Sequence, residues 1–381
     1  MKRTLHLHVL SSCLICIALA CAADAAEPND LSSLVRAVNG VGPKGAGHEP
    51  AIEACSRLSQ ADASRIPEIL AGMNDSGRLA ENWLRVVIET IAQRELEHSG
   101  SLPRDELEAF LADSTHSPHA RRLAYELILR VDPTAAARLV PAMLYDPSLE
   151  LRRDGVAYAL KTAKERLDAG DEEQALAAYR RTLSAARDVD QVNAAADGLR
   201  KLGETVDLPR HFGFLIDWKL VGPFDNKNTR GFDVAYGPER NPDPNATYQG
   251  QTEQVRWFDH TTDDPYGMVD LNEVLGRYKG AIAYAYAEFF SDRERPAEFR
   301  LGCINANKVW VNGQLLTANH VYHTGTYMDQ YIGKANLRRG KNVILLKIAQ
   351  NEQTDSWAQR WQFQFRVCDQ YGTAILSDDR R

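Results

Sequence analysis

The fold of this chain is decided by the stretch Asp217-Trp218-Lys219-Leu220-Val221-Gly222-Pro223-Phe224-Asp225-Asn226. Upstream of it, apolar residues recur at the three- and four-residue spacing of helices, and downstream they alternate with polar residues as in strands. The alternation Trp-Lys-Leu predicts a half-buried strand from Trp218 to Val221. We expect Gly222 and Pro223 to end this strand, because proline has no N–H to donate to a neighbouring strand.

The composition changes at the same place. Of the 31 Phe, Trp and Tyr residues, 25 follow residue 208. Residues 27–208 contain 22 Lys and Arg against 30 Asp and Glu, whereas residues 209–381 contain 21 of each kind. Such a shift is typical of Ala- and Leu-rich helices followed by an aromatic β core. Because 381 residues also favour two domains, we predict a helical domain over 27–208 and a β domain over 209–381.

The amino terminus has the three parts of a secretory signal. A basic start is followed by the apolar run 9–20 and by small residues, which predicts a signal peptide over 1–26 with cleavage after Ala25 or Ala26. The alternative is a lipid anchor at Cys21. Both interpretations make this an exported protein, periplasmic or extracellular.

Several classes of partner and reaction lack support in the sequence. The net charge of −7 and the absence of clustered Lys and Arg argue against nucleic acid. No later segment has the apolar length of a transmembrane helix. The motifs of serine hydrolases, zinc peptidases, P-loop proteins and paired-cysteine redox sites are missing. Gly40–Gly45 has the spacing of a dinucleotide fingerprint, but no strand precedes it and Pro43 interrupts it, so we interpret it as a connector.

Three cysteines follow the signal, namely Cys55, Cys303 and Cys368. This number is too small for a disulfide framework. Cys303 is in phase with the apolar residues of its strand, whereas Cys368 is out of phase with those of its own strand. The two are therefore expected on different faces, which favours three unpaired thiols over a Cys303–Cys368 pair.

The helical half contains a faint internal repeat. Its predicted second helices follow short turns that contain Asp75, Asp113 and Asp146, which are 38 and 33 residues apart. These helices are expected at about 79–92, 118–130 and 149–166. The spacing predicts helix pairs stacked into an α-solenoid, with Asp or Ser in the turn capping the second helix. The alternative is an irregular helical bundle.

These units resemble HEAT repeats, and residues 171–203 resemble a closing TPR-like pair. The resemblance implies that Arg85, Arg122 and Arg152 in the second helices bind the turn aspartates. A solenoid of this kind offers a concave surface for a protein partner, which is the role that we expect for it.

The second half reads as a series of short strands separated by turn residues. They are expected at 254–258, 281–290, 297–304, 308–311, 314–316, 329–335, 342–349 and 361–368. This series predicts an antiparallel β-sandwich packed against the last helices. Within it, Asn312-Gly313 lies between two apolar strands and predicts a tight type I′ hairpin.

At Trp310-Val311-Asn312-Gly313 and at the strand that ends in Leu345-Leu346-Lys347, the chain resembles the jelly-roll, galactose-binding-like domains that accompany many glycoside hydrolases. With the opening Trp-Lys-Leu-Val-Gly-Pro-Phe, it is similar to bacterial secreted proteins that join helical repeats to such a sandwich. The likeness covers about residues 213–376. It implies the fold more firmly than a ligand, because such sandwiches have many functions.

Carbohydrate binding requires aromatic faces and planar polar groups. Two loops of the predicted sandwich combine these residue types, and their candidate ligand-binding residues are Tyr322, Tyr327, Asp329, Asn351, Glu352, Gln353 and Trp357. The second loop is the more suggestive, because four polar residues precede its tryptophan. The alternative is a solvated loop with Trp357 folded onto the sandwich.

No cofactor is expected, although two groups of residues raise the question of a metal. His320 and His323, with Asp329, have a spacing that fits a metal site, but two loop histidines are more often a coincidence. The aspartates at 259, 263, 264 and 270 offer oxygens for calcium without the spacing of an EF-hand.

The sequence therefore favours a non-catalytic exported binding or scaffold protein. Its solenoid is expected to hold a protein partner, and its sandwich a glycan or another domain. The alternative is a carbohydrate-active hydrolase, or an accessory subunit of one, whose two catalytic carboxylates the sequence does not identify. A third hypothesis is that the sandwich only caps the solenoid.

Overall fold

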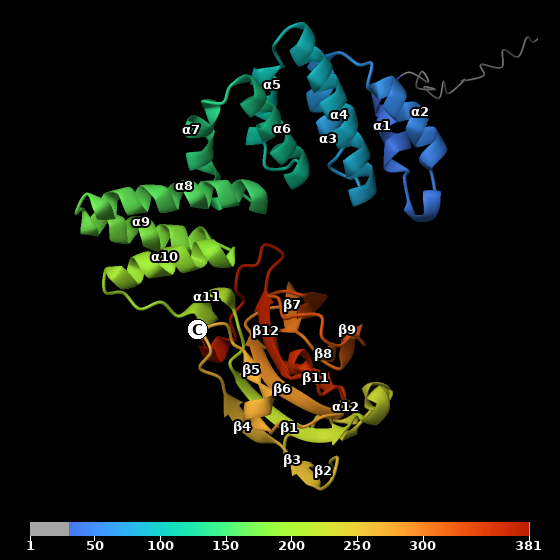
Figure 1. The fold of residues 1–381 in the computed structure, drawn as a ribbon. Coiled ribbons are helices and arrows are strands. Elements are labelled where there is room, and N and C mark those ends of the chain that lie inside the picture. The colour runs from blue at the N-terminus through green and yellow to red at the C-terminus, as the bar shows by residue number, and fades with distance from the viewer. Residues whose placement is uncertain (1–29, 381) are drawn as a thin grey trace, which may run out of the picture. The chain divides into compact units, whose positions relative to one another are not determined.

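The computed structural model describes residues 30–380, so the predicted signal peptide and Cys21 lie outside the described part. The chain divides into two compact units, Met1–Ala136 and Ala137–Arg381. Helices form the described part of the first unit, and the second unit runs from helices into β-strands (Figure 1). The predicted architecture, a helical region followed by an antiparallel sandwich, is confirmed. The domain boundary at residue 208 stays a prediction.

The first unit consists of paired helices. They are α1 (Leu31–Asn39), α2 (His48–Leu58), α3 (Ile66–Ala71), α4 (Arg78–His98), α5 (Arg104–Ala112) and α6 (Pro118–Val131). Each odd-numbered helix packs against the next helix, and α1 and α3 also contact the following pair. In α4, Leu84, Val87, Ile88 and Ile91 are buried at helical spacing, so one apolar stripe meets both neighbours.

The turns between the helices follow the prediction only in part. Ser148 accepts a hydrogen bond from the Leu151 N–H and caps its helix, as expected. In contrast, the N-cap residue of α4 is Gly77, which provides no side-chain cap. Arg85 binds Glu89 of its own helix at 2.9 Å and Glu126 of the next helix pair at 2.6 Å, rather than the turn residue Asp75.

The second unit begins with helices that pack side by side. Across the boundary lies α7 (Ala135–Leu139), which is followed by a 3-10 helix (Val140–Tyr145), α8 (Leu149–Asp168), α9 (Glu172–Ala185), α10 (Val189–Lys201) and α11 (Leu208–Phe212). The 3-10 helix and α9 both pack on α8, and α10 packs on α9. Among the described residues, no helix has both the length and the apolar character needed to cross a bilayer.

The sandwich consists of a six-stranded and a four-stranded antiparallel sheet, in the orders β4-β1-β6-β11-β8-β9 and β10-β7-β12-β5. A small sheet pairs β2 with β3. The strands are β1 (Asp217–Asp225), β2 (Thr247–Gln249), β3 (Gln254–Arg256), β4 (Phe258–Thr261), β5 (Val269–Asp270), β6 (Ala281–Ser291), β7 (Arg295–Cys303), β8 (Ala306–Val311), β9 (Gln314–Asn319), β10 (Tyr331–Leu337), β11 (Gly340–Gln350) and β12 (Gln362–Cys368). Alternate residues of both sheets fill the core between them, including Trp218, Phe299, Leu346, Phe363 and Phe365.

Strand β1 does not end at Gly222-Pro223, so that prediction is wrong. It continues to Asp225 and keeps its pairing with β6, with a shift in register between Val221 and Phe224. Before the shift, Trp218 faces the core between the sheets, whereas Val221 and Phe224 face the outer side of the six-stranded sheet. An irregularity of this kind absorbs a proline within a strand without breaking the sheet.

Two other local predictions are confirmed. Asn312 and Gly313 have φ values of 51° and 79°, as a type I′ hairpin between β8 and β9 requires. Cys55, Cys303 and Cys368 are free thiols, and the last two are buried. Burial raises the pKa of the Cys303 thiol to about 12 and that of Cys368 to about 11, which makes both poor nucleophiles at neutral pH.

Within the second unit, the sandwich is packed on the helices. Phe212 and Phe214 are buried with apolar residues of α8, α9 and α10, and Tyr266 from the sandwich packs against the same cluster. The Tyr266 hydroxyl donates to Asn193 at 2.8 Å. The unit is therefore held together by a continuous apolar interface with polar bonds at its edge.

Candidate functional site

Two loops that are separate in sequence meet at one end of the sandwich. One follows β9 and the other follows β11. His323 contacts both sides of this meeting point. Its Nε2 lies 3.0 Å from Oδ1 of Asn351. Its ring is perpendicular to that of Trp357, and the two ring centroids are 5.1 Å apart. Asn351 also donates to Oε1 of Gln353 at 2.8 Å. We call His323, Asn351, Gln353 and Trp357 the Trp357 cluster.

Trp357 remains largely accessible in this cluster. Its side chain belongs to the short helical turn Ser356–Ala358 and is 58% exposed. The contact with His323 orients the indole without covering it, so the ring is not folded onto the sandwich. An exposed aromatic ring beside oriented amide groups is an arrangement that can bind a small polar ligand with an apolar face.

The base of the two loops is a network of buried amides. Asn226 donates to the main-chain oxygen of Gln350 at 2.9 Å and to the Tyr322 hydroxyl at 3.1 Å, and it accepts from the Phe232 N–H at 3.1 Å. The Gln350 side chain accepts from Asn305 and from the Asn351 N–H, both at 3.1 Å. Buried amides that are hydrogen-bonded in this way fix the loop ends and therefore orient the Trp357 cluster.

Tyr322 and Glu352 lie at the sides of the cluster. Tyr322 is half-buried, and burial raises the pKa of its hydroxyl even though the hydrogen bond from Asn226 opposes this effect. The Glu352 carboxylate accepts from the Asn228 N–H at 2.8 Å, so it faces the turn after β1. The structure thus brings Asn351, Gln353 and Trp357 together, with Tyr322 and Glu352 next to them.

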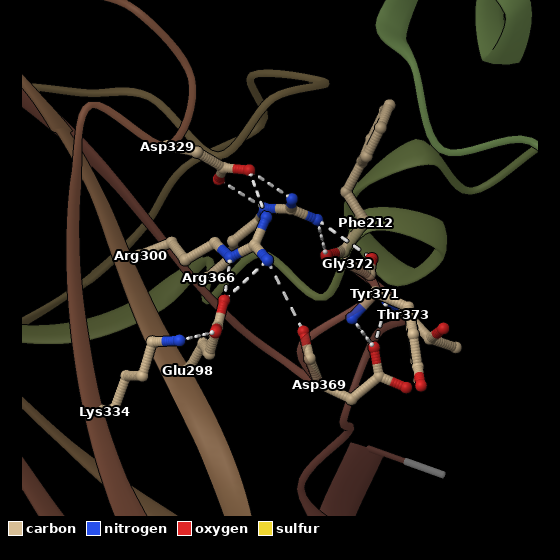
Figure 2. Close-up of polar contacts among 10 residues, drawn as sticks. All are labelled: Phe212, Glu298, Arg300, Asp329, Lys334, Arg366, Asp369, Tyr371, Gly372 and Thr373. Carbon is tan, nitrogen blue, oxygen red and sulfur yellow. Dashed lines mark hydrogen bonds and ion pairs between the residues drawn. The ribbon is translucent and has the colours of Figure 1, made fainter. Parts of the chain in front are cut away.

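The other two predicted ligand-binding residues, Tyr327 and Asp329, do not belong to the Trp357 cluster. Tyr327 is 67% exposed. Asp329 lies against the four-stranded sheet, where it accepts hydrogen bonds of 2.7 Å from both Arg300 and Arg366 (Figure 2). Its carboxylate is therefore committed to arginines, and it is not shared with the Trp357 cluster.

Arg300, Arg366, Asp329 and Glu298 form a second polar group, which we call the arginine clamp. Arg366 is 3% exposed and donates to the main-chain oxygens of Phe212 in α11 and of Gly372 (Figure 2). Arg300 donates to Glu298 at 2.6 Å, and Lys334 lies 3.0 Å from the same carboxylate. The clamp thus joins the outer face of the four-stranded sheet to the helices and to the turn after β12.

The charges of the clamp are balanced. Burial alone would raise the pKa of Asp329, but the hydrogen bonds and charges of Arg366 and Arg300 outweigh it and lower that pKa. For Glu298, burial is similarly outweighed by Lys334 and Arg300, so its pKa is lowered as well. Both carboxylates are consequently ionised at neutral pH.

Sequence reasoning missed the clamp, although a signal for it exists. Glu298 and Arg300 alternate in β7 with the core residues Phe299 and Leu301, and Arg366 occupies an equivalent position in β12. Charged residues at alternate positions of a strand indicate the outward face of a sheet. What the alternation does not reveal is that the loop residue Asp329 folds back onto this face.

The two groups of residues that raised the question of a metal do not form metal sites in the described structure. His320 stacks on Phe232 with centroids 4.1 Å apart, whereas His323 and Asp329 have the partners described above. Of the calcium candidates, Asp264 accepts main-chain N–H bonds, Asp270 caps a short helix and Asp259 binds Lys219. Over residues 30–380, no three His, Cys, Asp or Glu side chains are grouped so that they could hold a metal ion.

No family model and no curated protein matches this chain. Solved structures that are similar to parts of it include a β-glucosidase from Kluyveromyces marxianus, with 12% identity over 42% of this chain and a TM-score of 0.26. Others are an FMN-binding β-glucuronidase from Facaelibacterium prausnitzii L2-6 (12% identity, 40% of this chain, TM-score 0.21) and a GH31 α-xylosidase from Xanthomonas citri (11%, 29% and 0.17). This chain covers 17%, 21% and 15% of those three chains, respectively. The similarity is a distant one to fragments of glycoside hydrolases, and it carries no argument about activity.

Proposed function

We propose that this chain is an exported, non-catalytic binding protein of the bacterial type that joins HEAT-like repeats to a galactose-binding-like sandwich. In this proposal the Trp357 cluster binds a carbohydrate and the helical repeats bind a protein partner. The observation that carries the carbohydrate part is that Trp357 is 58% exposed and lies beside the side chains of Asn351, Gln353 and His323.

The chemistry of the cluster suits a sugar. The apolar face of a pyranose ring packs on an exposed indole, and its hydroxyls pair with groups that both donate and accept. The exposed amide of Gln353 provides such groups, and its hydrogen bond from the buried Asn351 amide reduces the side-chain freedom that binding would otherwise have to restrict.

The carboxylates that line two hollows of the sandwich favour binding over hydrolysis there. A glycosidase needs a general acid whose pKa is raised, together with a second carboxylate across the bound sugar. Glu298 and Asp369 line one hollow of the sandwich, but the pKa of Glu298 is lowered and Asp369 accepts from the N–H groups of its own turn. Another hollow, which contains Glu288, measures only about 80 Å³.

The protein-binding part of the proposal rests on the first unit. A shallow, open surface lies along α4 and α6, with Val86, Thr90 and Gln93 from α4 and Arg130 from α6. Val86 is 65% exposed there, which is a suitable contact point for a partner.

The part of the proposal that concerns export to the periplasm or beyond rests on the predicted signal peptide.

We expect Trp357→Ala to weaken the binding of at least one glycan by the protein at least about tenfold, since an aromatic platform supplies most of the contact with a sugar ring. The measurement is a glycan-array screen of the chain without residues 1–26, followed by titration of the best hit. Phe258→Ala is the matched control, because Phe258 is another exposed aromatic and lies on β4, outside the Trp357 cluster. Equal binding by Trp357→Ala and the unmodified protein would refute the assignment.

A further inference from the structure

A hollow of about 470 Å³ lies on the outer side of the four-stranded sheet, apart from the Trp357 cluster. Its lining comes from β7, β10 and the turn after β12, and includes Glu298, Lys334, Asn336, Gln370 and Tyr371. This volume lies within the range of roughly 300–1,000 Å³ that is usual for small-molecule sites. Asp369 and the apolar residues Pro296, Ala297 and Ala335 complete the lining.

The turn that carries Tyr371 is held rigidly. Oδ1 of Asp369 accepts from the N–H groups of Tyr371 at 2.8 Å and of Thr373 at 2.9 Å. Gly372 has a φ of 76°, a conformation that favours glycine. Arg366 of the arginine clamp donates to the Gly372 oxygen (Figure 2). The clamp and Asp369 therefore fix the main chain of the turn that places Tyr371 at the edge of the hollow.

The polar groups that face the hollow differ in their availability. Glu298 is neutralised by Arg300 and Lys334. Among the described residues, the Asn336 and Gln370 amides and the Tyr371 hydroxyl have no hydrogen-bond partner, and each can both donate and accept. Free neutral groups beside a compensated ion pair fit an uncharged, hydroxyl-rich ligand better than a phosphate or an acidic peptide.

The geometry points to a second carbohydrate site in this hollow, which holds one or two sugar rings against Tyr371. The site does not require the Trp357 cluster, because the two share no residue. A chain with both sites binds two separate glycan segments, and linked glycans consequently gain avidity.

The test is isothermal titration of the chain without residues 1–26 with five probes, namely galactose, glucose, N-acetylglucosamine, cellobiose and lactose. Trp357→Ala removes the first site, and Tyr371→Ala is made both alone and in this background. We expect Trp357→Ala to retain binding of at least one probe and the double variant to bind it at least about tenfold more weakly. Ile332→Ala in the same background is the matched control, because Ile332 is exposed on β10 but does not line the hollow.

The outcomes separate the two proposals. Loss of all binding in Trp357→Ala alone overturns the second site and leaves the proposed function intact. If Tyr371→Ala alone loses sugar binding and Trp357→Ala binds like the unmodified protein, the second site is supported and the site at the Trp357 cluster is refuted. Unchanged binding in the double variant overturns the second site, as does a protein that binds none of the probes. Thermal unfolding at the same temperature in all variants shows that each one is folded.

Discussion

Replacing Lys347 with alanine is expected to lower the free energy of unfolding of the second unit by about 3–5 kcal/mol, the usual cost of leaving a buried charge without its partner. Lys347 is fully buried on the outer side of the six-stranded sheet, and its Nζ lies 2.7 Å from Oε1 of Glu239. Without the ammonium group, the Glu239 carboxylate stays in an apolar environment next to Tyr284.

The reason for this large effect is the number of groups that depend on one ammonium. Lys347 also donates to the main-chain oxygens of Phe232 and Val234, both at 2.9 Å. It thereby fixes the segment after β1 on the sheet. Burial lowers the pKa of Lys347, although Glu239 opposes this effect. The same burial raises the pKa of Tyr284, whose hydroxyl binds Glu239.

Urea unfolding followed by tryptophan fluorescence measures the effect. Lys341→Ala is the matched control: Lys341 lies on the same strand and binds Glu288, but its side chain is 51% exposed, so a loss below about 1 kcal/mol is expected. Equal losses for the two variants would show that the Lys347 pair contributes no more than a surface ion pair. If Lys347→Ala does not fold, Lys347→Met, which preserves the length of the side chain, provides the comparison.

The second large effect is expected in the arginine clamp. Asp329→Ala leaves Arg366, which is 3% exposed, without its carboxylate, and at pH 7 it should cost about 3–5 kcal/mol of unfolding free energy. Because Arg366 also holds Phe212 and Gly372, hydrogen exchange in α11 and in the turn 369–373 should accelerate in this variant.

The cost of Asp329→Ala is also expected to depend on pH. The pKa of Asp329 is lowered in the folded protein, so its stabilising effect is complete above the unfolded-state value of about 3.9 and disappears as the pH falls through the folded-state value. The difference in unfolding free energy between the unmodified protein and Asp329→Ala should therefore shrink below about pH 4.

Unfolding curves at pH 7, 5 and 3 provide the measurement. Asp259→Ala serves as the control, since Asp259 binds Lys219 on the surface and its side chain is 83% exposed. A difference that stays constant from pH 7 to pH 3 would contradict the assigned ion pair.

The sequence determined the secondary structure because its signals act over a few residues. Helical spacing predicted helices at 79–92, 118–130 and 149–166, and these lie within the observed α4, α6 and α8. Alternation predicted the strands from β6 to β12, and Asn312-Gly313 predicted their hairpin. Local backbone preference and the apolar face of an element are present in the chain before any long-range contact forms.

Tertiary structure alone decided how the candidate residues are used. Of the polar candidates, Asn351 and Gln353 meet Trp357 through His323, whereas Asp329 binds Arg300 and Arg366. Asp329 is 29 and 37 residues away from these arginines, and Lys347 is 108 residues away from Glu239. No periodic pattern encodes pairs at such separations, since they depend on which surfaces are buried against each other. For the same reason, β1 continues through Gly222-Pro223, because its pairing with β6 outweighs the local preference of proline.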